Sequence, residues 1–289
     1  MVKIVFSCFI CSMIFISGCA GKKKKLAAIM KADTLIKATL PNEGSVNSST
    51  PYNSVNKHLD LYDKNITFYG TNSNWEIFIQ SDSILLFKSD SDTLRFLISK
   101  KSQAQDVAVV RYYSKKELTL DDTIRSKKQI TLSIFEGPFL DETSSTYYPF
   151  SVRVSINDPL DKQLAYYSGG GFYLGSPRIH DIWVLDSLNK VKVSATDYPN
   201  GFPTLEFHLD GGKIHGFAGC NDFSSSFYFI QNQIQFSSTA STLKICMQMT
   251  GETSFLSLIS NKRYAYYFLT NRLKLKHANG TEIVLKKVD

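Results

Sequence analysis

The sequence predicts a mainly β protein with a minor helical part: two antiparallel β-rich domains of barrel or sandwich type, the second with one short helix. The first observation is the aromatic content of 13%, with 15 Tyr and 20 Phe, because these side chains favour strands. The second is a series of short apolar segments separated by turn residues. The third is that 289 residues allow two ordinary domains, and 43% hydrophobic residues exclude a disordered chain.

The first domain is expected over residues 59–175 and consists of short strands. Turn residues such as Asp90-Ser91-Asp92 separate them, Asn157-Asp158-Pro159 predicts a tight turn, and Gly169-Gly170-Gly171 predicts a break between strands. We expect the strands at 66–69, 75–80, 83–88, 93–99, 108–113, 130–136 and 150–156.

The second domain is expected over residues 176–289 and opens at Ser176-Pro177. Thr250 is expected to start a helix that runs to Ser260, with Glu252 in its first turn, where a negative charge suits the helix dipole. We expect the strands at 182–188, 204–209, 213–217, 226–230, 233–236, 264–269, 272–277 and 282–286.

Residues 1–18 are expected to be a signal peptide that takes no part in the fold. The apolar run at 4–16 is shorter than the roughly 20 residues that cross a bilayer as a helix. It leads into Ile16-Ser17-Gly18-Cys19, which resembles the lipobox of bacterial lipoproteins. The resemblance implies that the Cys19 thiol accepts a diacylglyceryl group and anchors the chain. The alternative is an uncleaved anchor with a chance cysteine, which the four lysines after the apolar run favour.

The excess of basic residues is concentrated beside this predicted anchor. The formal charge is +7, but Lys3 and the four lysines at 22–25 supply five of the 33 Lys and Arg, which leaves 28 against 26 acidic residues. We therefore expect residues 19–58 to be a lipidated basic tether and linker, with its lysines at the lipid headgroups. The nearly neutral remainder predicts no nucleic-acid partner.

Two cysteines remain once the signal peptide is removed and Cys19 is acylated. They are Cys220 and Cys246, and outside the cytoplasm such a pair usually forms a disulfide. A bond that closes this loop would stabilise the fold by roughly 3.5 kcal/mol in the chain-entropy account. Two buried free thiols are the alternative.

Three motifs follow one another in the second domain. They are G-x-x-G-C-N, T-x-x-x-C and E-x-x-F, and their defining residues include Gly216, Gly219, Cys220, Asn221, Thr242, Cys246 and Glu252. Together they resemble the META domain of HslJ-like heat-shock lipoproteins over about residues 178–289. The resemblance implies a small β-rich envelope domain linked with stress and antibiotic tolerance, without established catalysis. From the residues alone, a turn pinned by the disulfide explains the first motif, and a recognition loop at 219–221 is the alternative.

The first domain carries a weaker resemblance. Gly70-Thr71-Asn72-Ser73-Asn74-Trp75, Asp141-Glu142-Thr143-Ser144 and Tyr148-Pro149-Phe150 are similar to segments of an uncharacterised periplasmic lipoprotein domain that accompanies META domains. The resemblance covers residues 65–175. Phe139 stands where that family has one cysteine and Gly170 stands near the second, so its disulfide is absent from this chain.

A metal site is the alternative use of the second domain. His208 and His215 flank a glycine pair; a two-residue turn there would place their side chains opposite each other, whereas a three-residue loop would separate them. Met247 and Met249 add soft sulfur ligands of the kind that Cu(I) prefers, although methionines are also common core residues. The sequence offers the histidine pair no evident third ligand.

The mature chain lacks the motifs of common enzyme classes, since no P-loop, dinucleotide fingerprint, H-E-x-x-H or G-x-S-x-G occurs. We therefore expect no enzyme and no cofactor beyond the covalent lipid on Cys19. The expected protein is a monomeric cell-envelope lipoprotein, anchored in the outer membrane and facing the periplasm, that serves as a binding or structural module in stress or antibiotic tolerance. Its partner is expected to be an envelope protein or a small molecule. The alternative is a periplasmic lipoprotein that binds or handles copper or zinc.

Overall fold

The computed structural model describes residue 61 and residues 64–104, 108–118, 124–125, 127–160, 162–246 and 250–288. The predicted signal peptide, Cys19 and the tether lie outside the described residues, and so do Met247 and Met249. The prediction of a mainly β, antiparallel chain is confirmed, with one α-helix in the described part. No helix of these segments is long and apolar enough to span a membrane. The predicted domain limits stay predictions.

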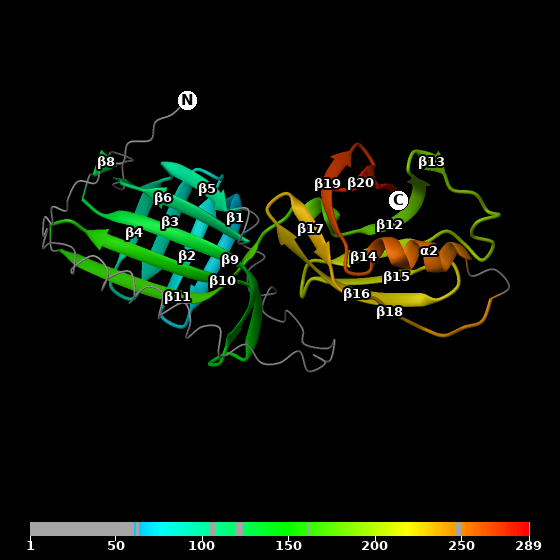
Figure 1. The fold of residues 1–289 in the computed structure, drawn as a ribbon, viewed down its shortest axis with the longest axis horizontal. Helices are drawn as coiled ribbons and strands as arrows, with labels where there is room; N and C mark the ends of the chain where they lie inside the picture. The colour runs from blue at the N-terminus through cyan, green and yellow to red at the C-terminus, as the bar shows by residue number, and fades with distance from the viewer. Residues whose placement is uncertain are drawn as a thin grey trace, which may run out of the picture. The chain divides into compact units, whose positions relative to one another are not determined.

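The strands up to residue 173 form a closed antiparallel barrel (Figure 1). Pairing runs from β1 through β2 and β3 to β4. Next, β4 pairs with β7, and β5, which follows β4 directly, pairs with β6. β6 then pairs with β9, β9 with β10, β10 with β11, and β11 with β1, which closes the barrel. The bounds are β1 (Ile66–Asn72), β2 (Trp75–Gln80), β3 (Ile84–Ser89), β4 (Thr93–Leu97), β5 (Lys100–Ala104), β6 (Val109–Ser114), β7 (Lys116–Leu118), β8 (Ile124–Arg125), β9 (Gln129–Asp141), β10 (Thr146–Asp158) and β11 (Gln163–Tyr173).

Apolar side chains at every second position of neighbouring strands fill the inside of this barrel. Every second residue of a strand points to the same face, so apolar residues at that spacing converge on one side. On β9 and β10 the buried residues face each other in three pairs, which are Ile134 with Val152, Leu132 with Val154, and Ile130 with Ile156. This register is fixed because a slip of either strand by one residue would turn its three buried side chains outward.

A second, smaller apolar cluster lies on the outer face of the same barrel. Tyr69 and Phe78 point outward, since their strand neighbours belong to the inner core, and their rings lie 5.2 Å apart. Phe172 stacks on Tyr148 with ring planes only 8° apart. Tyr148 precedes the part of β10 that pairs with β11, so this end of the β9–β10 hairpin packs against the outer face of the barrel.

The three glycines at 169–171 lie inside β11, so the predicted break is wrong. The strand continues through them and pairs with β1 and β10 on its two sides. A Cβ on Gly169 would lie 2.1 Å from the carbonyl oxygen of Thr71, and one on Gly170 would lie 2.3 Å from the Tyr148 ring. The glycines are therefore needed for close approach of neighbouring chain and not for a turn.

The strands from residue 182 onward form a second closed circuit (Figure 1). β12 pairs with β14, the order continues through β15, β16, β17, β19 and β20 to β21, and β21 returns to β12. The bounds are η3 (Pro177–Ile179, a 3-10 turn), β12 (Ile182–Leu188), β13 (Val191–Lys192), β14 (Thr204–His208), β15 (Lys213–Phe217), β16 (Asp222–Ile230), β17 (Gln233–Phe236), β18 (Ala240–Ser241), α2 (Thr250–Ile259), β19 (Arg263–Leu269), β20 (Arg272–His277) and β21 (Glu282–Lys287).

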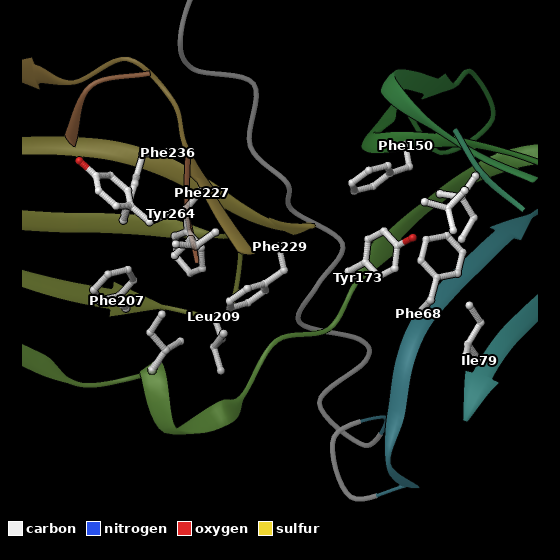
Figure 2. Packing of buried hydrophobic residues seen from close by; sticks show 14 of the residues in the cluster. Phe68, Ile79, Phe150, Tyr173, Phe207, Leu209, Phe227, Phe229, Phe236 and Tyr264 are labelled. Carbon is white, nitrogen blue, oxygen red and sulfur yellow. The ribbon is translucent and has the colours of Figure 1, made fainter. Parts of the chain in front are cut away.

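Aromatic rings dominate the core of the second barrel, and Figure 2 shows several of them converging. Phe207 lies 5.3 Å from Phe227 and 6.2 Å from Phe236, measured between ring centroids, and Phe236 lies 6.0 Å from Tyr264. Edge-to-face and tilted contacts of this kind add to the stabilisation from burial alone. The hydroxyl of Tyr264 donates to the carbonyl oxygen of Leu258 in α2, so the core also holds the helix.

α2 begins at Thr250, where the sequence predicts a helix start. Phe255 and Ile259 are four residues apart, lie on one side of the helix and are fully buried, with the Phe255 ring 6.1 Å from Phe223 of β16. Glu252, in the first turn, is also buried, at 6% exposed. The helix therefore packs one apolar side on the barrel and brings a carboxylate with it.

The close approach at Gly169 predicts that Gly169→Ala destabilises the protein. The added methyl group would overlap the Thr71 carbonyl, which the strand pairing holds in place, so we expect the free energy of unfolding to fall by about 3 kcal/mol. Urea denaturation followed by far-UV circular dichroism would measure the change. Ser168→Ala, on an exposed position of the same strand, is the matched control and should change stability by less than about 0.5 kcal/mol. Equal midpoints for the two variants would contradict the close approach.

Buried tyrosines predict a loss of stability at alkaline pH. Burial raises the pKa of Tyr112 to about 12 and that of Tyr264 to about 12, against about 10 in the unfolded chain. Above pH 10 the unfolded chain therefore releases phenol protons that the folded chain retains, and stability must fall as the pH rises. Urea midpoints measured between about pH 8 and 11 should decline above pH 10. Tyr264→Phe should decline less steeply across that range, and an unchanged slope would refute the assignment.

Candidate functional site

The G-x-x-G-C-N motif forms the tight connection between β15 and β16. Gly219 has a φ of +110°, a value that other residues rarely adopt, and a Cβ there would lie 2.8 Å from the Tyr198 ring. The backbone N–H of Ala218 donates to the carbonyl oxygen of Asn221 over 2.8 Å, which closes the turn. The turn places Cys220 and Asn221 side by side at the start of β16, both buried.

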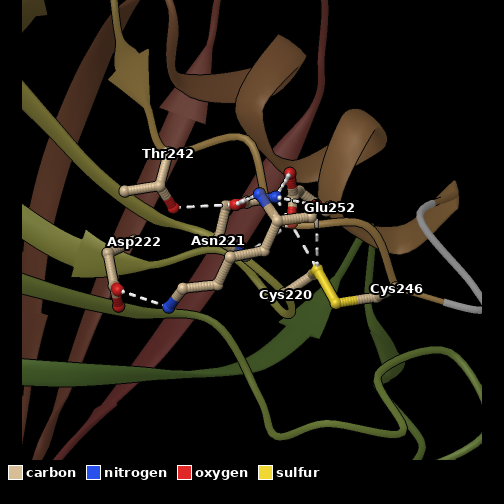
Figure 3. The surroundings of a disulfide bond; sticks show 7 residues. Cys220, Asn221, Asp222, Thr242, Cys246 and Glu252 are labelled. Atoms are coloured by element: carbon tan, nitrogen blue, oxygen red, sulfur yellow. Dashed lines mark hydrogen bonds and ion pairs between the residues drawn. A yellow bond between two sulfur atoms is a disulfide. The ribbon is translucent and has the colours of Figure 1, made fainter.

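The side-chain amide of Asn221 binds the segment at residues 242–244, as Figure 3 shows. Its oxygen accepts hydrogen bonds from the Thr242 hydroxyl at 2.7 Å and from the backbone N–H of Lys244 at 2.6 Å. Its NH₂ group donates to the carbonyl oxygen of Lys244 at 3.1 Å. The amide therefore pairs with this segment much as a neighbouring strand would.

Glu252 fixes Asn221 from the other side (Figure 3). One carboxylate oxygen accepts from the backbone N–H of Asn221 at 2.7 Å, and the other accepts from its side-chain NH₂ at 3.0 Å. A buried carboxylate requires such donors, because leaving it unpaired would cost several kcal/mol. The sequence places Glu252 in the E-x-x-F motif and in the first turn of the helix, but its pairing with a residue 31 positions earlier leaves no local signal.

A disulfide joins the two ends of this arrangement. Cys220 and Cys246 are bonded, with their Cα atoms 6.2 Å apart and 26 positions between them in sequence, which is the pairing that the sequence predicts. The distance lies within the usual range for disulfides. Together the disulfide and the Asn221 amide hold residues 242–246 against the barrel at both ends and in the middle.

The held segment exposes two apolar side chains. Leu243 is 94% exposed and Ile245 is 96% exposed, more than any other large hydrophobic residue of the described chain. Thr242, Lys244 and Cys246, which alternate with them, make the bonds to the barrel. We call residues 242–246 the clamped loop. The charge at its centre is matched, since the Lys244 ammonium lies 2.9 Å from a carboxylate oxygen of Asp222.

The two predicted metal-ligating histidines meet, but in a different register from the one expected. The connection between β14 and β15 contains four residues, so His208 pairs with Lys213 and His215 pairs with Glu206. The rings of His208 and His215 are diagonal neighbours with centroids 5.4 Å apart. Neither alternative for the turn, with two or three residues, describes this connection.

Two further residues, which sequence reasoning missed, lie near this pair. The ring of His180 is centred 6.0 Å from that of His208, and His208 Nε2 lies 3.1 Å from a carboxylate oxygen of Glu206. His180 turns its Nδ1 toward the carbonyl oxygen of Phe207, at 2.8 Å. Within the segments that the structure describes, no group of three or more His, Cys, Asp or Glu is placed to hold a metal ion. The metal role of His208 and His215 stays a prediction without support from a third ligand.

A polar cavity of about 690 Å³ lies beside Tyr112 and Tyr173. Asp82, Lys101, Tyr112, Tyr173 and Gln231 are among its lining residues. Its charged groups are already bonded: Asp82 accepts from the Thr67 hydroxyl at 2.8 Å, and Lys101 donates to the Gln231 amide oxygen at 2.9 Å. Burial raises the pKa of Tyr173 far above its usual value, so this phenol stays protonated. These lining residues do not form a nucleophile–base pair.

The comparisons with known proteins agree with the motif resemblance. Residues 179–289 match the family model of the META domain, a range that contains all three motifs. None of the curated proteins matches the chain.

Two solved structures are also similar to this chain. One, described as the NMR structure of a protein, is 20% identical, covers 39% of this chain and 96% of its own, with a TM-score of 0.32. The other is the NMR structure of a protein from Burkholderia xenovorans and is 21% identical, covering 38% of this chain and 85% of its own, also with a TM-score of 0.32. Similarity at this level identifies no function.

The bonding of Asn221 predicts that Asn221→Ala strongly destabilises the protein. The substitution would remove one of the two donors to the buried Glu252 carboxylate and both side-chain partners of the Lys244 backbone, and we expect a loss of about 3 kcal/mol or more in the free energy of unfolding. The loss would be measured by urea denaturation without reductant.

Asp222→Asn is the matched control, because it changes the next residue and removes only an exposed ion pair. Its effect should stay below about 1 kcal/mol. Similar losses for both variants would mean that the Asn221 amide has no special role.

Proposed function

We propose that the chain is a bacterial cell-envelope lipoprotein whose META-type domain is a non-enzymatic binding or structural module in stress or antibiotic tolerance. In this proposal the lipid on Cys19 anchors the protein in the outer membrane, and the barrels face the periplasm. The match of residues 179–289 to the META domain supports the family part of the proposal.

One observation carries the non-enzymatic part of the proposal: the polar groups of the motif bond to one another. Both carboxylate oxygens of Glu252 and the amide oxygen and NH₂ of Asn221 have partners within the fold, and both cysteines are in the disulfide. A catalytic group must instead be available to a substrate, within hydrogen-bond reach of the reacting atom. The polar groups and the cysteines of the motif therefore hold a loop in place, and the loop is what remains available to a partner.

The anchor part of the proposal is supported by the order of residues at the N-terminus. An apolar run too short to cross the bilayer, two small residues and a cysteine stand in the order that lipoprotein processing needs. The disulfide is consistent with an oxidising compartment, where such bonds persist. Within the described residues, the contacts of His208 with His215, His180 and Glu206 do not bring three metal ligands together, so the alternative of metal handling has less support.

The proposed anchor predicts that Cys19→Ala keeps the chain as an unprocessed precursor. Without the thiol no diacylglyceryl group is attached and residues 1–18 stay in place. The mass of the Cys19→Ala chain should therefore differ from that of the processed wild-type protein by the mass of residues 1–18 minus the mass of the attached lipid. Intact-mass analysis of the membrane fraction would measure both forms. Cys8→Ala, within the same predicted signal peptide, is the control and should be processed normally. Normal processing of the Cys19→Ala chain would refute lipidation.

The role in tolerance is tested in cells that lack this chain. Survival under heat and under envelope-directed antibiotics should fall, and the wild-type chain should restore it whereas the Cys19→Ala chain should not. A deletion strain that survives both treatments as the parent does would overturn the proposed role.

A further inference from the structure

We propose that the clamped loop, residues 242–246, docks on the membrane surface by inserting Leu243 and Ile245 at the lipid interface. This inference rests on the proposed function, because it takes the membrane to which the N-terminus is anchored as the partner. It adds a second membrane contact that lies in the folded domain and not in the tether.

The fold imposes the exposure of Leu243 and Ile245. Lys244, between them, is bonded through its backbone N–H and carbonyl group to the Asn221 amide, and Cys246 is covalently fixed to Cys220. The backbone N–H of Thr242 also donates to the carbonyl oxygen of Asp222, at 3.0 Å. Leu243 and Ile245 therefore cannot turn inward without breaking these bonds. A loop with free ends would lower its free energy by burying them.

The apolar surface of the clamped loop is small for a protein–protein interface. A stable protein–protein interface buries about 800 Å² on each partner, with a packed centre that usually contains aromatic or arginine anchors. Two aliphatic side chains on a narrow loop present much less than this area. Shallow insertion into a bilayer interface needs only a few apolar side chains, provided that a second signal holds the protein at the membrane.

The proposed lipid anchor on Cys19 is such a second signal. About 40 residues separate Cys19 from Leu61, where the described structure begins, so in any conformation the tether keeps this point within roughly 140 Å of the bilayer. Tethering turns docking into an intramolecular step with an effective concentration that can reach the millimolar range, so that weak insertion is sufficient.

The test uses tryptophan as a depth reporter in the full-length chain, reconstituted into vesicles of phosphatidylethanolamine and phosphatidylglycerol. The two native tryptophans, Trp75 and Trp183, are 5% and 3% exposed and give a constant background. Leu243→Trp should show a blue-shifted emission and at least twofold stronger quenching by lipids that are brominated near the headgroup than the matched control. The control is Leu160→Trp, at a 64% exposed leucine in the turn between β10 and β11.

A second substitution tests whether the neighbouring side chain inserts as well. Ile245→Ser in the Leu243→Trp chain should reduce the quenching about twofold, whereas Leu160→Ser in the same chain should leave it unchanged. Both positions are exposed, so neither change should affect folding, and the urea midpoint would verify this.

Every outcome decides the proposal. Quenching no stronger than that of the control overturns docking, and so does a blue shift that depends on protein concentration without vesicles, which would indicate that a second copy covers the loop. Flotation with vesicles and the intact mass are recorded separately. If the chain floats with the vesicles but carries no acyl group, lipidation is refuted. The quenching still measures docking of the clamped loop in that case, because the apolar N-terminal run holds the chain at the vesicle. A chain that does not float overturns both proposals.

Discussion

The second barrel depends on one amide side chain that joins three separate stretches of sequence. Asn221 follows the tight turn before β16, and it binds the clamped loop on one side and Glu252 of α2 on the other. Only an amide provides both an acceptor for the Lys244 N–H and donors for its carbonyl and for the carboxylate. Aspartate would bring a second negative charge next to Glu252, and an apolar residue would leave several buried groups unpaired. The cysteines, the glycine turn and the helix position all serve this one arrangement.

Much of the fold could be predicted from the sequence because its strands obey a simple period. Inward-facing pairs such as Leu132 with Val154 come from apolar residues at every second position. Each predicted strand overlaps an observed one, but β9, β10 and β16 are longer than predicted, and β5, β7, β8, β11, β13 and β18 have no predicted counterpart. β11 was missed for a physical reason. A glycine run usually indicates a turn, but here Gly169 and Gly170 are needed because other atoms occupy the space that their Cβ atoms would fill. Such crowding involves residues far away in sequence and leaves no trace in local composition.

In the candidate site, the disulfide could be predicted from the sequence, but the hydrogen bonds of Asn221 and Glu252 could not. The disulfide followed from counting cysteines and from the expected compartment, two quantities that need no geometry. The pairing of Glu252 with Asn221 depends on how α2 packs on the barrel, so the sequence could assign the glutamate only to its own helix. For the histidine pair only the expected register was wrong: the turn contains four residues, so His208 lies opposite Lys213 and diagonally to His215. Register is a property of two strands together, which a single local motif does not fix.

Closure of the two barrels also protects neighbouring copies of the chain from aggregating through their sheet edges. An open sheet presents unpaired N–H and C=O groups along its edge strands, which can join the sheets of neighbouring molecules into aggregates. In each barrel the first and last strands of the circuit pair with each other, β1 with β11 and β12 with β21, so these strands do not form open edges. A protein held at a surface reaches a high local concentration, where edge-to-edge pairing would be most damaging. In the proposed lipid-anchored state, barrel closure would suit this chain to crowding in two dimensions.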